Sequence, residues 1–441
     1  MDRRNFIKNS TKTGIALMAL SLMSLKASEK NQSLINLKKD PNKLFNLPDF
    51  LDYKIVARNG EVMSDGLQTP PRPDGMACFQ NDNGTITLIK NHEIGSRRLP
   101  SSYDSNLPKS ISYDTNFAGV PYTGGTTSLV LDPKSLKAID HYRSLAGTIN
   151  NCAGGRTSWG SWISCEETRM DDHGYAFEVY ANKKPNSVRR LDYMGRFNRE
   201  AVAIYDKNGI VYQTEDDEAG LFYRFLPDDK KDLSKPGKLQ ALKIKSQIDP
   251  RNQKNLLKQG SLFEVEWVDI TDIHAKKSTT KAQGLKLGAS PFNGSEGIIT
   301  DENSVFFTCK DGGFKEYGQI FRYYPSKYEG TKKEKSAPGV IELFYESKSK
   351  DEYWGGDNIV IAPWGDLIIC EDNGSRGCKL LGINSEGSLY VIGQVEDSSS
   401  EIAGVCFSPD KKTMFLNIQD EGRTIAIFGD WSKISLSLIH I

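Results

Sequence analysis

A pattern of two short apolar runs recurs along the chain. In each copy a polar or acidic residue opens the first run, a turn rich in Asp, Asn, Gly or Pro follows, and the second run ends on acidic or amide residues. One copy extends from Arg199 through a turn at 206–209 to Glu215, and others begin near residues 295, 356 and 400. Looser copies begin at Asp74 and Asn151. Short runs of β-branched and aromatic residues between turn residues predict antiparallel hairpins.

The spacing of these copies predicts a β-propeller. Asp357 and Glu401 open successive copies and lie 44 residues apart (401 − 357), close to the roughly 40–50 residues of one propeller blade. Further strand-like runs follow the hairpins, as at 379–383, and would supply outer strands. We therefore expect an all-β fold, a single β-propeller of about six blades over residues 47–435, with a polar insertion at about 228–289.

Residues 1–28 are typical of a twin-arginine export signal. Arg3 and Arg4 precede a modestly apolar run at 14–25, as in proteins that cross the membrane folded. This run is shorter than the roughly 20 residues of a spanning helix, so we expect no stable membrane anchor. Residues 29–46 would form a polar leader. The sequence thus predicts a periplasmic or secreted protein whose partner during export is the twin-arginine translocase.

Composition narrows the function classes. Lys plus Arg and Asp plus Glu both number 57, so no global charge favours nucleic acid or an anionic membrane as a partner. The five histidines form no zinc motif, and the chain contains no dinucleotide-binding, P-loop or serine-hydrolase motif. Seven widely spread cysteines fit no small disulfide scaffold, although a bridge between Cys370 and Cys378 stays open.

Acidic residues recur at the same places in the hairpins, and a propeller would bring them together. The start of the first strand and the end of the second lie at one edge of a hairpin, and the first strand of each blade lines the central channel. We expect these residues at one mouth of the channel: Glu93, Glu166, Glu167, Glu200, Glu215, Asp216, Glu296, Asp357, Glu371, Asp372 and Glu401. So many carboxylates require cations, because like charges a few Å apart raise each other's pKa. Oxygen ligands favour Ca²⁺, Mg²⁺, Mn²⁺ or Fe³⁺, whereas a thiolate such as Cys165 suits a transition metal.

Several motifs resemble those of the PhoX-type alkaline phosphatases. They include NCAGGRTSWGSWISCEE at 151–167, REAVA at 199–203 and EIAGVCFSPD at 401–410. The resemblance extends from about residue 74 to residue 431. It implies an exported propeller enzyme that hydrolyses phosphate esters with a mixed cofactor of iron (Fe³⁺) and calcium (Ca²⁺).

The resemblance also implies roles for single residues. Cys165 matches the family's iron-ligating cysteine, whereas we expect Cys152 to tolerate substitution. Lys310 and Arg199, followed by Arg156, are the candidates for binding phosphate. The family's acidic positions, expected to supply most iron and calcium ligands, fall on Glu93, Glu167, Glu200, Glu215, Glu296, Asp357, Glu371 and Glu401. The implied reaction is hydrolysis of small phosphate ester substrates by metal-assisted phosphoryl transfer from the ester, without a serine nucleophile. We expect the enzyme to be a monomer.

Three other interpretations stay open. A calcium-dependent propeller hydrolase of the lactonase or phytase type would use a similar acidic mouth, but it needs no cysteine there. A non-catalytic binding propeller would keep the blades without needing the carboxylates. An acidic mouth that serves only as a structural calcium site lies between these two.

Overall fold

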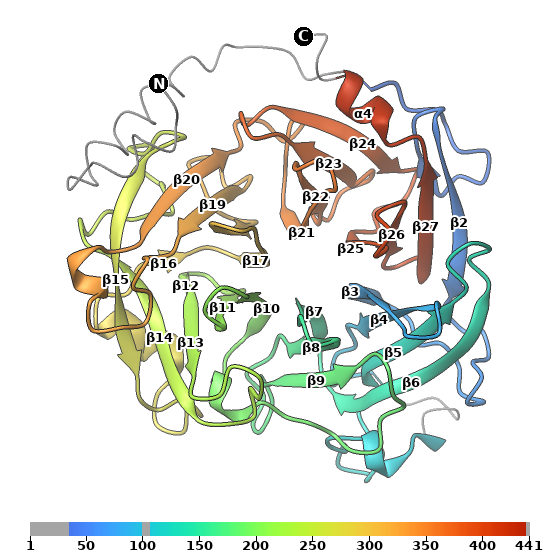
Figure 1. Cartoon of the computed structure of the whole chain (residues 1–441), viewed down its shortest axis with the longest axis horizontal. Helices are drawn as coiled ribbons and strands as arrows, with labels where there is room; N and C mark the ends of the chain where they lie inside the picture. Colours follow the sequence, from blue (N-terminus) through green and yellow to red (C-terminus); the bar gives the residue numbers. More distant parts are fainter. Residues whose placement is uncertain (1–34, 99–105, 438–441) are drawn as a thin grey trace.

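The structure is a computed structural model, and it describes residues 35–98 and 106–437. Its sheets are arranged radially around one axis (Figure 1). The innermost strands contact one another in a closed ring, from the first blade to the sixth and back to the first. They are β3 (Pro73–Gln80), β7 (Asn151–Arg156), β10 (Arg199–Tyr205), β17 (Ser295–Thr300), β21 (Gly356–Ile361) and β25 (Ile402–Phe407). The prediction of an all-β propeller is confirmed.

Each inner strand pairs with the next strand in an antiparallel hairpin, as the recurring pattern predicts. The second strands, in the order of the blades, are β4 (Ile86–His92), β8 (Ser161–Glu166), β11 (Ile210–Glu215), β18 (Val305–Cys309), β22 (Leu367–Glu371) and β26 (Thr413–Ile418). The outer strands are β5 (Gly124–Leu131), β6 (Ala138–Thr148), β9 (Ala176–Tyr180), β13 (Tyr223–Pro227), β14 (Gly237–Ile244), β19 (Gln319–Tyr324), β20 (Val340–Glu346), β23 (Lys379–Ile383), β24 (Leu389–Val395) and β27 (Arg423–Gly429).

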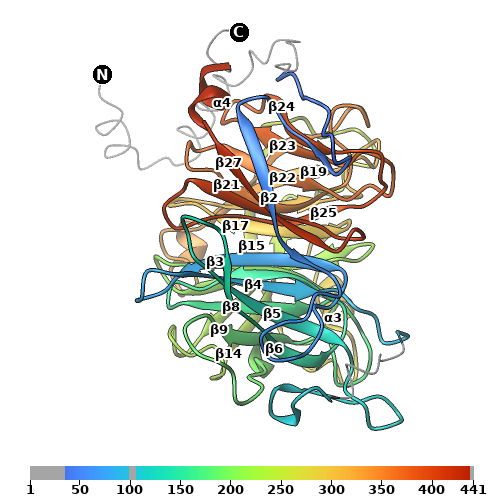
Figure 2. The ribbon, with the colours of Figure 1, turned by 90° about the vertical axis from the view of Figure 1, so that its right-hand side faces the viewer.

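The chain segment before the first blade closes the ring. Strand β2 (Leu51–Arg58) pairs with β27 of the sixth blade, and the two lie side by side in Figure 2. Strand β1 (Phe45–Asn46) pairs with β24 of the fifth blade, so the end of the predicted polar leader is part of a sheet. The predicted export signal lies outside the described residues.

The segment predicted as an insertion, 228–289, is partly built into the sheets. It supplies β14, the outer strand of the third blade, and β15 (Leu262–Ile270), which pairs with β14 on one side and β20 of the fourth blade on the other. It also contains a short helix, α3 (Thr280–Lys286). The remaining elements are β12 (Gly220–Leu221), β16 (Pro291–Phe292), α4 (Ser432–Ser437) and 3₁₀ turns at Lys109–Ile111, Asp192–Met194 and Glu334–Ser336.

Neighbouring blades pack face to face, so the inner strands are buried on both sides. Every residue of β11 and β22 is buried, which explains the apolar runs at 210–212 and 367–370. Between the third and fourth blades, for example, Phe222 stacks on Phe307 with ring centroids 4.4 Å apart. Only the ends of an inner hairpin are therefore free to face the channel. Within the described residues, no helix has the length and apolar character needed to cross a membrane.

Candidate metal centre

The same irregularity recurs at the channel end of the inner hairpins. In five blades the first residue of the inner strand pairs with the last residue of the second strand, and the register then shifts by one residue. In the sixth blade the shift follows Ala403. Such a β-bulge re-aims the side chains next to it. Two positions in each blade are affected: the second residue of the inner strand and the residue that follows the second strand.

Residues at these two positions, together with Glu401 directly before β25, form three groups of potential metal ligands. Within each group the ligand atoms lie within 4.8 Å of one another. We call them the cysteine cluster (Cys152, Glu167 and Glu200), the central cluster (Glu200, Glu296 and Asp357) and the oxygen cluster (Asp74, Glu93 and Glu401). Together they draw ligands from all six blades, and Glu200 belongs to two of them.

Close contact between inner strands brings these side chains together. At Gly297, an added Cβ atom would lie 2.6 Å from the carbonyl oxygen of Asp357 in the next blade. Only glycine permits this approach, which places Glu296 and Asp357 in one cluster. The sequence SEG at 295–297 therefore combines a ligand with the residue that lets the neighbouring blade come near.

Lys310, a candidate for binding phosphate in the sequence analysis, lies among the carboxylates. Its Nζ is 2.6 Å from Glu296 Oε1, 3.3 Å from Asp216 Oδ2 and 3.7 Å from Asp372 Oδ2. Burial disfavours the ammonium, yet the charges of Glu296, Asp216 and Asp372 raise the pKa of Lys310. Asp216 and Asp372 thus also lie at the channel mouth, beside the central cluster.

Of the two cysteines in the 151–167 stretch, Cys152 lies among the potential metal ligands and Cys165 does not, whereas the sequence predicts the reverse. Cys165 is fully buried in an apolar cluster that includes Ile163 and Ala176, and burial raises the pKa of its thiol to about 12. It lies inside β8, where side chains point at the neighbouring blades and not at the channel. Cys152 lies at the bulge of β7, and it is the thiol of the cysteine cluster. All seven cysteines are buried and free, so Cys370 and Cys378 form no bridge in this structure.

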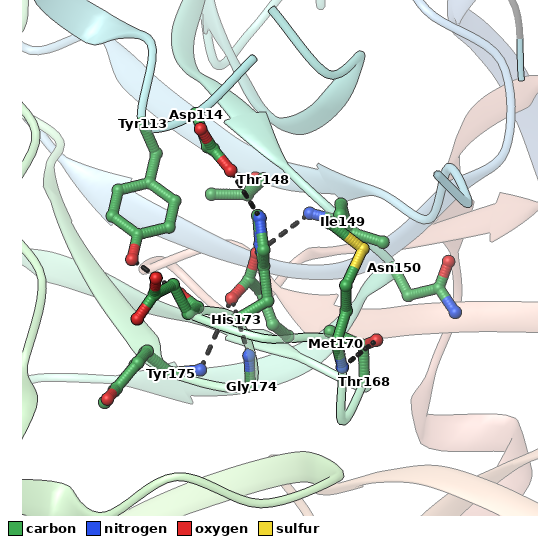
Figure 3. A network of polar contacts seen from close by, with 12 residues as sticks. Tyr113, Asp114, Thr148, Ile149, Asn150, Thr168, Met170, His173, Gly174 and Tyr175 are labelled. Atoms are coloured by element: carbon green, nitrogen blue, oxygen red, sulfur yellow. Dashed lines mark hydrogen bonds and ion pairs between the residues drawn. The ribbon is translucent and has the colours of Figure 1, made fainter. Parts of the chain in front are cut away.

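Glu166 was expected at the mouth, but its carboxylate lies inside the second blade. It accepts hydrogen bonds from the backbone nitrogens of Ile149 and Gly174, both at 2.9 Å, and from Nδ1 of His173 at 2.6 Å. Figure 3 shows His173 in this network, with Asp114 at its other ring nitrogen. This carboxylate holds three chain segments together and is already fully hydrogen-bonded.

Glu215 and Glu371 have the same kind of environment, and neither belongs to a cluster of the described residues. Glu215 Oε2 accepts from the backbone nitrogen of Leu221 at 3.0 Å and from the Tyr223 hydroxyl at 2.8 Å. Glu371 accepts from the backbone nitrogen of Trp354 through Oε1 at 3.1 Å and from that of Lys379 through Oε2 at 2.9 Å. As the last residues of their strands, both point into the blade.

Neither arginine candidate lies among the clustered ligands. Arg199 is fully buried, donates to the carbonyl of Gly195 at 2.6 Å, and stacks on Phe197 with its guanidinium 4.0 Å from the ring centroid. Burial lowers its pKa to about 10. Arg156 ends β7, at the opposite end of the strand from the bulge, and its guanidinium lies 5.4 Å from the ring centroid of Phe79.

Sequence reasoning missed Asp74 and Arg72. Asp74 opens the first blade at the position that Glu200 holds in the third, and this equivalence is the signal that could have found it. Arg72 Nη2 lies 2.5 Å from Glu93 Oε2, and Nη1 lies 2.6 Å from Asp420 Oδ1. Arg72 therefore places a second cation at the mouth, on the side of the oxygen cluster.

The clustered carboxyl groups raise one another's pKa values. These shifts indicate whether the site fits metal ions. Burial and the charge of Asp216 raise the pKa of Glu167 to about 8, and burial and Asp372 raise that of Asp357 to about 7. The pKa of Glu200 rises well above its ordinary value through burial and its neighbours Glu296 and Asp357. Bound cations would reverse these shifts, so the donor set fits metal ions.

A buried amide oxygen adds to this fit. Gln419 Nε2 donates to Asp74 Oδ2 at 2.6 Å and to Glu93 Oε2 at 3.0 Å. Its Oε1 is buried without a hydrogen-bond partner among the described residues. An acceptor left without a partner beside the oxygen cluster is the type of group that a hard cation could bind.

Comparison with known proteins gives the family. The structure of PhoX from Pseudomonas fluorescens in complex with vanadate, a transition state analogue, is similar with a TM-score of 0.67 and 16% identity, covering 88% of this chain and 96% of that one. Gluconolactonase structures from Pseudomonas aeruginosa (TM-score 0.43, 10% identity, 85% and 91% covered) and Xanthomonas campestris (0.40, 10%, 84% and 94%) are more distant. No curated protein sequence matches. The family model described as alkaline phosphatase PhoX matches residues 120–422, more than half of the chain, so this protein belongs to the PhoX family of alkaline phosphatases.

Proposed function

We propose that this phosphatase hydrolyses phosphate esters with metal ions held by the three clusters at the channel mouth. One observation carries the proposal: all six blades send a buried or half-buried potential ligand to the channel mouth. Such a gathering costs free energy in the absence of cations, because each buried carboxylate disfavours the ionisation of the next. A merely structural role would not require ligands from every blade.

The chemistry of the donors suggests which metal each cluster takes. The cysteine cluster combines one sulfur with carboxylate oxygens, which suits ferric iron. The oxygen cluster, with the amide of Gln419 beside it, suits Ca²⁺. Glu200 belongs to both the cysteine cluster and the central cluster, so its carboxylate would be available to a cation in either one. Burial and the carboxylates of Glu200 and Glu167 raise the pKa of the Cys152 thiol, so metal binding must displace its proton.

The chain's own cations would bind the phosphate group of the substrate. Lys310 Nζ lies among three carboxylates, and we assign it the role of binding the phosphate oxygens. Arg72 would be a second phosphate-binding group, at the opposite side of the mouth. Bound metals supply further neutralisation of charge for in-line phosphoryl transfer. Asp216 and Asp372 would orient the Lys310 ammonium. Arg199 would take no part, since its guanidinium is held inside the third blade.

The two cysteines provide the test. In Cys152→Ser, the sulfur ligand is lost, and we expect iron content, any visible charge-transfer absorption and kcat/KM for a chromogenic phosphate monoester to fall together, the last by about 100-fold. In Cys165→Ser, a hydroxyl replaces a thiol in an apolar core, which should lower stability while folded protein keeps its metals.

The opposite pattern would reject this assignment. If Cys165→Ser loses iron and Cys152→Ser keeps it, the iron lies elsewhere. A wild-type enzyme that is free of iron and active with calcium alone would instead favour a calcium-only phosphatase, for which the thiol has no purpose.

We further propose export through the twin-arginine pathway and a monomeric periplasmic or secreted enzyme. A pathway that carries folded protein allows the metals to be loaded before export. Replacing Arg3 and Arg4 by Lys should leave folded enzyme in the cytoplasm, as cell fractionation would show. Unchanged periplasmic yield would reject this route. Gel filtration of the exported enzyme tests the monomer.

A further inference from the structure

A pocket of about 460 Å³ opens beside the candidate metal centre. Its lining comes from loops of the third, fourth and fifth blades and includes Asn293, Asp311, Tyr317, Lys350 and Trp354. This volume lies in the range of small-molecule sites, about 300–1,000 Å³. The lining combines two aromatic rings with amide, carboxylate and ammonium groups, a mixture that can bind an organic group with both ring and polar parts.

The turns that line the pocket also carry the channel residues. Asp311 follows Lys310 directly, and the charges of Lys310, Asp216 and Asp372 act on its carboxylate. Asn293 precedes the turn in which the carbonyl of Gly294 accepts from the backbone nitrogen of Lys310 at 2.7 Å. A phosphate group at Lys310 would therefore have its ester oxygen close to this pocket.

The fifth blade supplies the aromatic part of the wall in the same way. The backbone nitrogen of Trp354 donates to Glu371, and the backbone nitrogen of Gly355 donates to the carbonyl of Tyr317 at 3.0 Å. These bonds hold the Trp354 segment beside the Tyr317 segment. Trp354 lies three residues before Asp357 in the chain. Lys350 Nζ lies 3.6 Å from the ring centroid of Trp354 and 5.4 Å from that of Tyr317.

Tyr317 and Trp354 are both partly exposed, and both line the pocket. An indole and a phenol that keep accessible surface in a pocket offer apolar, flat contact area on which a ring of a ligand can stack. Asn293 adds polar groups, and Lys350 adds a positive charge near the rings. A short aliphatic alcohol has no ring to use this surface.

We propose that the pocket binds the leaving group of the substrate and favours phosphate esters of alcohols that carry a planar ring. This inference rests on the proposed function, which places the phosphate at Lys310. Aryl esters and nucleoside monophosphates share the required ring. They differ in the hydroxyl groups of the sugar, for which Asn293 and Asp311 offer hydrogen bonds.

The test compares three esters: phenyl phosphate, adenosine 5′-monophosphate and glycerol 1-phosphate. We expect Trp354→Ala to lower kcat/KM for the two ring esters by about tenfold more than for glycerol phosphate, and Trp354→Phe to restore most of the difference. Phe117→Ala is the matched control, because Phe117 is a fully exposed aromatic residue outside the pocket, and it should change none of the three values. An Asn293→Ala loss confined to the nucleotide would identify the sugar as part of the ligand.

Equal losses for all three esters in Trp354→Ala, without rescue by Phe, would overturn the inference and leave Trp354 a structural residue. Calorimetric binding of adenosine or phenol to the wild type and Trp354→Ala decides the case independently of turnover. If the wild type hydrolyses no ester, the proposed function fails, and the binding experiment still shows whether the pocket takes a ring. Absence of ring binding together with hydrolysis of glycerol phosphate would reject the pocket alone.

Discussion

Adjacent acidic residues in this protein have opposite surroundings. At three second strands, the last residue and the residue that follows it are both acidic. The first member of each pair faces the blade, and the second faces the channel. The pairs are Glu166 and Glu167, Glu215 and Asp216, and Glu371 and Asp372. The blade-facing member accepts backbone hydrogen bonds, whereas the channel-facing member lies with other charged groups. A step of one residue thus separates a carboxylate that stabilises the fold from one that forms the site.

This comparison teaches that burial alone does not identify a ligand. Glu200 and Glu215 are both buried and both have a raised pKa, mainly because of burial. For Glu215, hydrogen bonds from Tyr223 and Leu221 oppose the shift, whereas for Glu200 further carboxylates add to it. Uncompensated charge, and not burial, marks the channel-facing set.

The largest effect should come from Glu200, which belongs to two clusters. We expect Glu200→Gln to lower kcat/KM by about 100-fold or more and to reduce bound metal, because the amide carries no charge to hold a cation. Glu215→Gln is the matched control, with equal burial and an equal change of shape. It should lose stability, by about 1–3 kcal/mol, while folded protein keeps its metal. Equal metal loss in both variants would erase the distinction between the two sets.

A smaller loss of activity should follow removal of the channel-facing cation. Lys310→Gln takes one positive charge from the phosphate site, and we expect kcat/KM to fall by roughly 10- to 100-fold with weaker inhibition by inorganic phosphate. Lys281→Gln is the control, since Lys281 pairs with Asp217 and touches no cluster residue. Unaltered phosphate inhibition in Lys310→Gln would show that another group binds the substrate.

The Glu371 and Asp372 pair tests the comparison within a single strand end. Glu371→Ala leaves the backbone nitrogens of Trp354 and Lys379 without their acceptors, and we expect a loss of about 2 kcal/mol in the free energy of unfolding. Asp372→Ala should leave stability nearly unchanged and should alter activity instead, because Asp372 lies beside Lys310. Denaturant melts and steady-state kinetics on both variants check this. A stability loss in Asp372→Ala with an activity loss in folded Glu371→Ala would contradict it.

The fold was predictable because hairpin patterns are local, and much of the site was predictable because the repeat aligns the hairpin ends. Glu200, Glu296, Asp357 and Glu401 were found in this way. The bulge was not predictable, since it depends on pairing between strands and leaves no mark in the apolar pattern. It decides that Cys152 faces the channel and Cys165 does not. The hydrogen bonds that hold Glu166 come from a separate loop, which no repeat spacing indicates.

The smallest effect on activity should come from Lys90, a blade-facing lysine that contrasts with Lys310. Its side chain is fully buried at the seam between the first and sixth blades, where Nζ donates to Thr424 Oγ1 at 2.9 Å. Burial lowers its pKa to about 7, against about 10.4 in the unfolded chain. Between these values the unfolded state binds one more proton than the native state, so this lysine makes the free energy of unfolding rise with pH, by at most about 1.4 kcal/mol per unit. We expect Lys90→Met to remove that rise in thermal melts between pH 7 and pH 10 and to leave kcat/KM nearly unchanged, whereas the exposed Lys54→Met keeps the rise. A pH dependence that persists in Lys90→Met would mean that Lys90 stays charged in the folded protein.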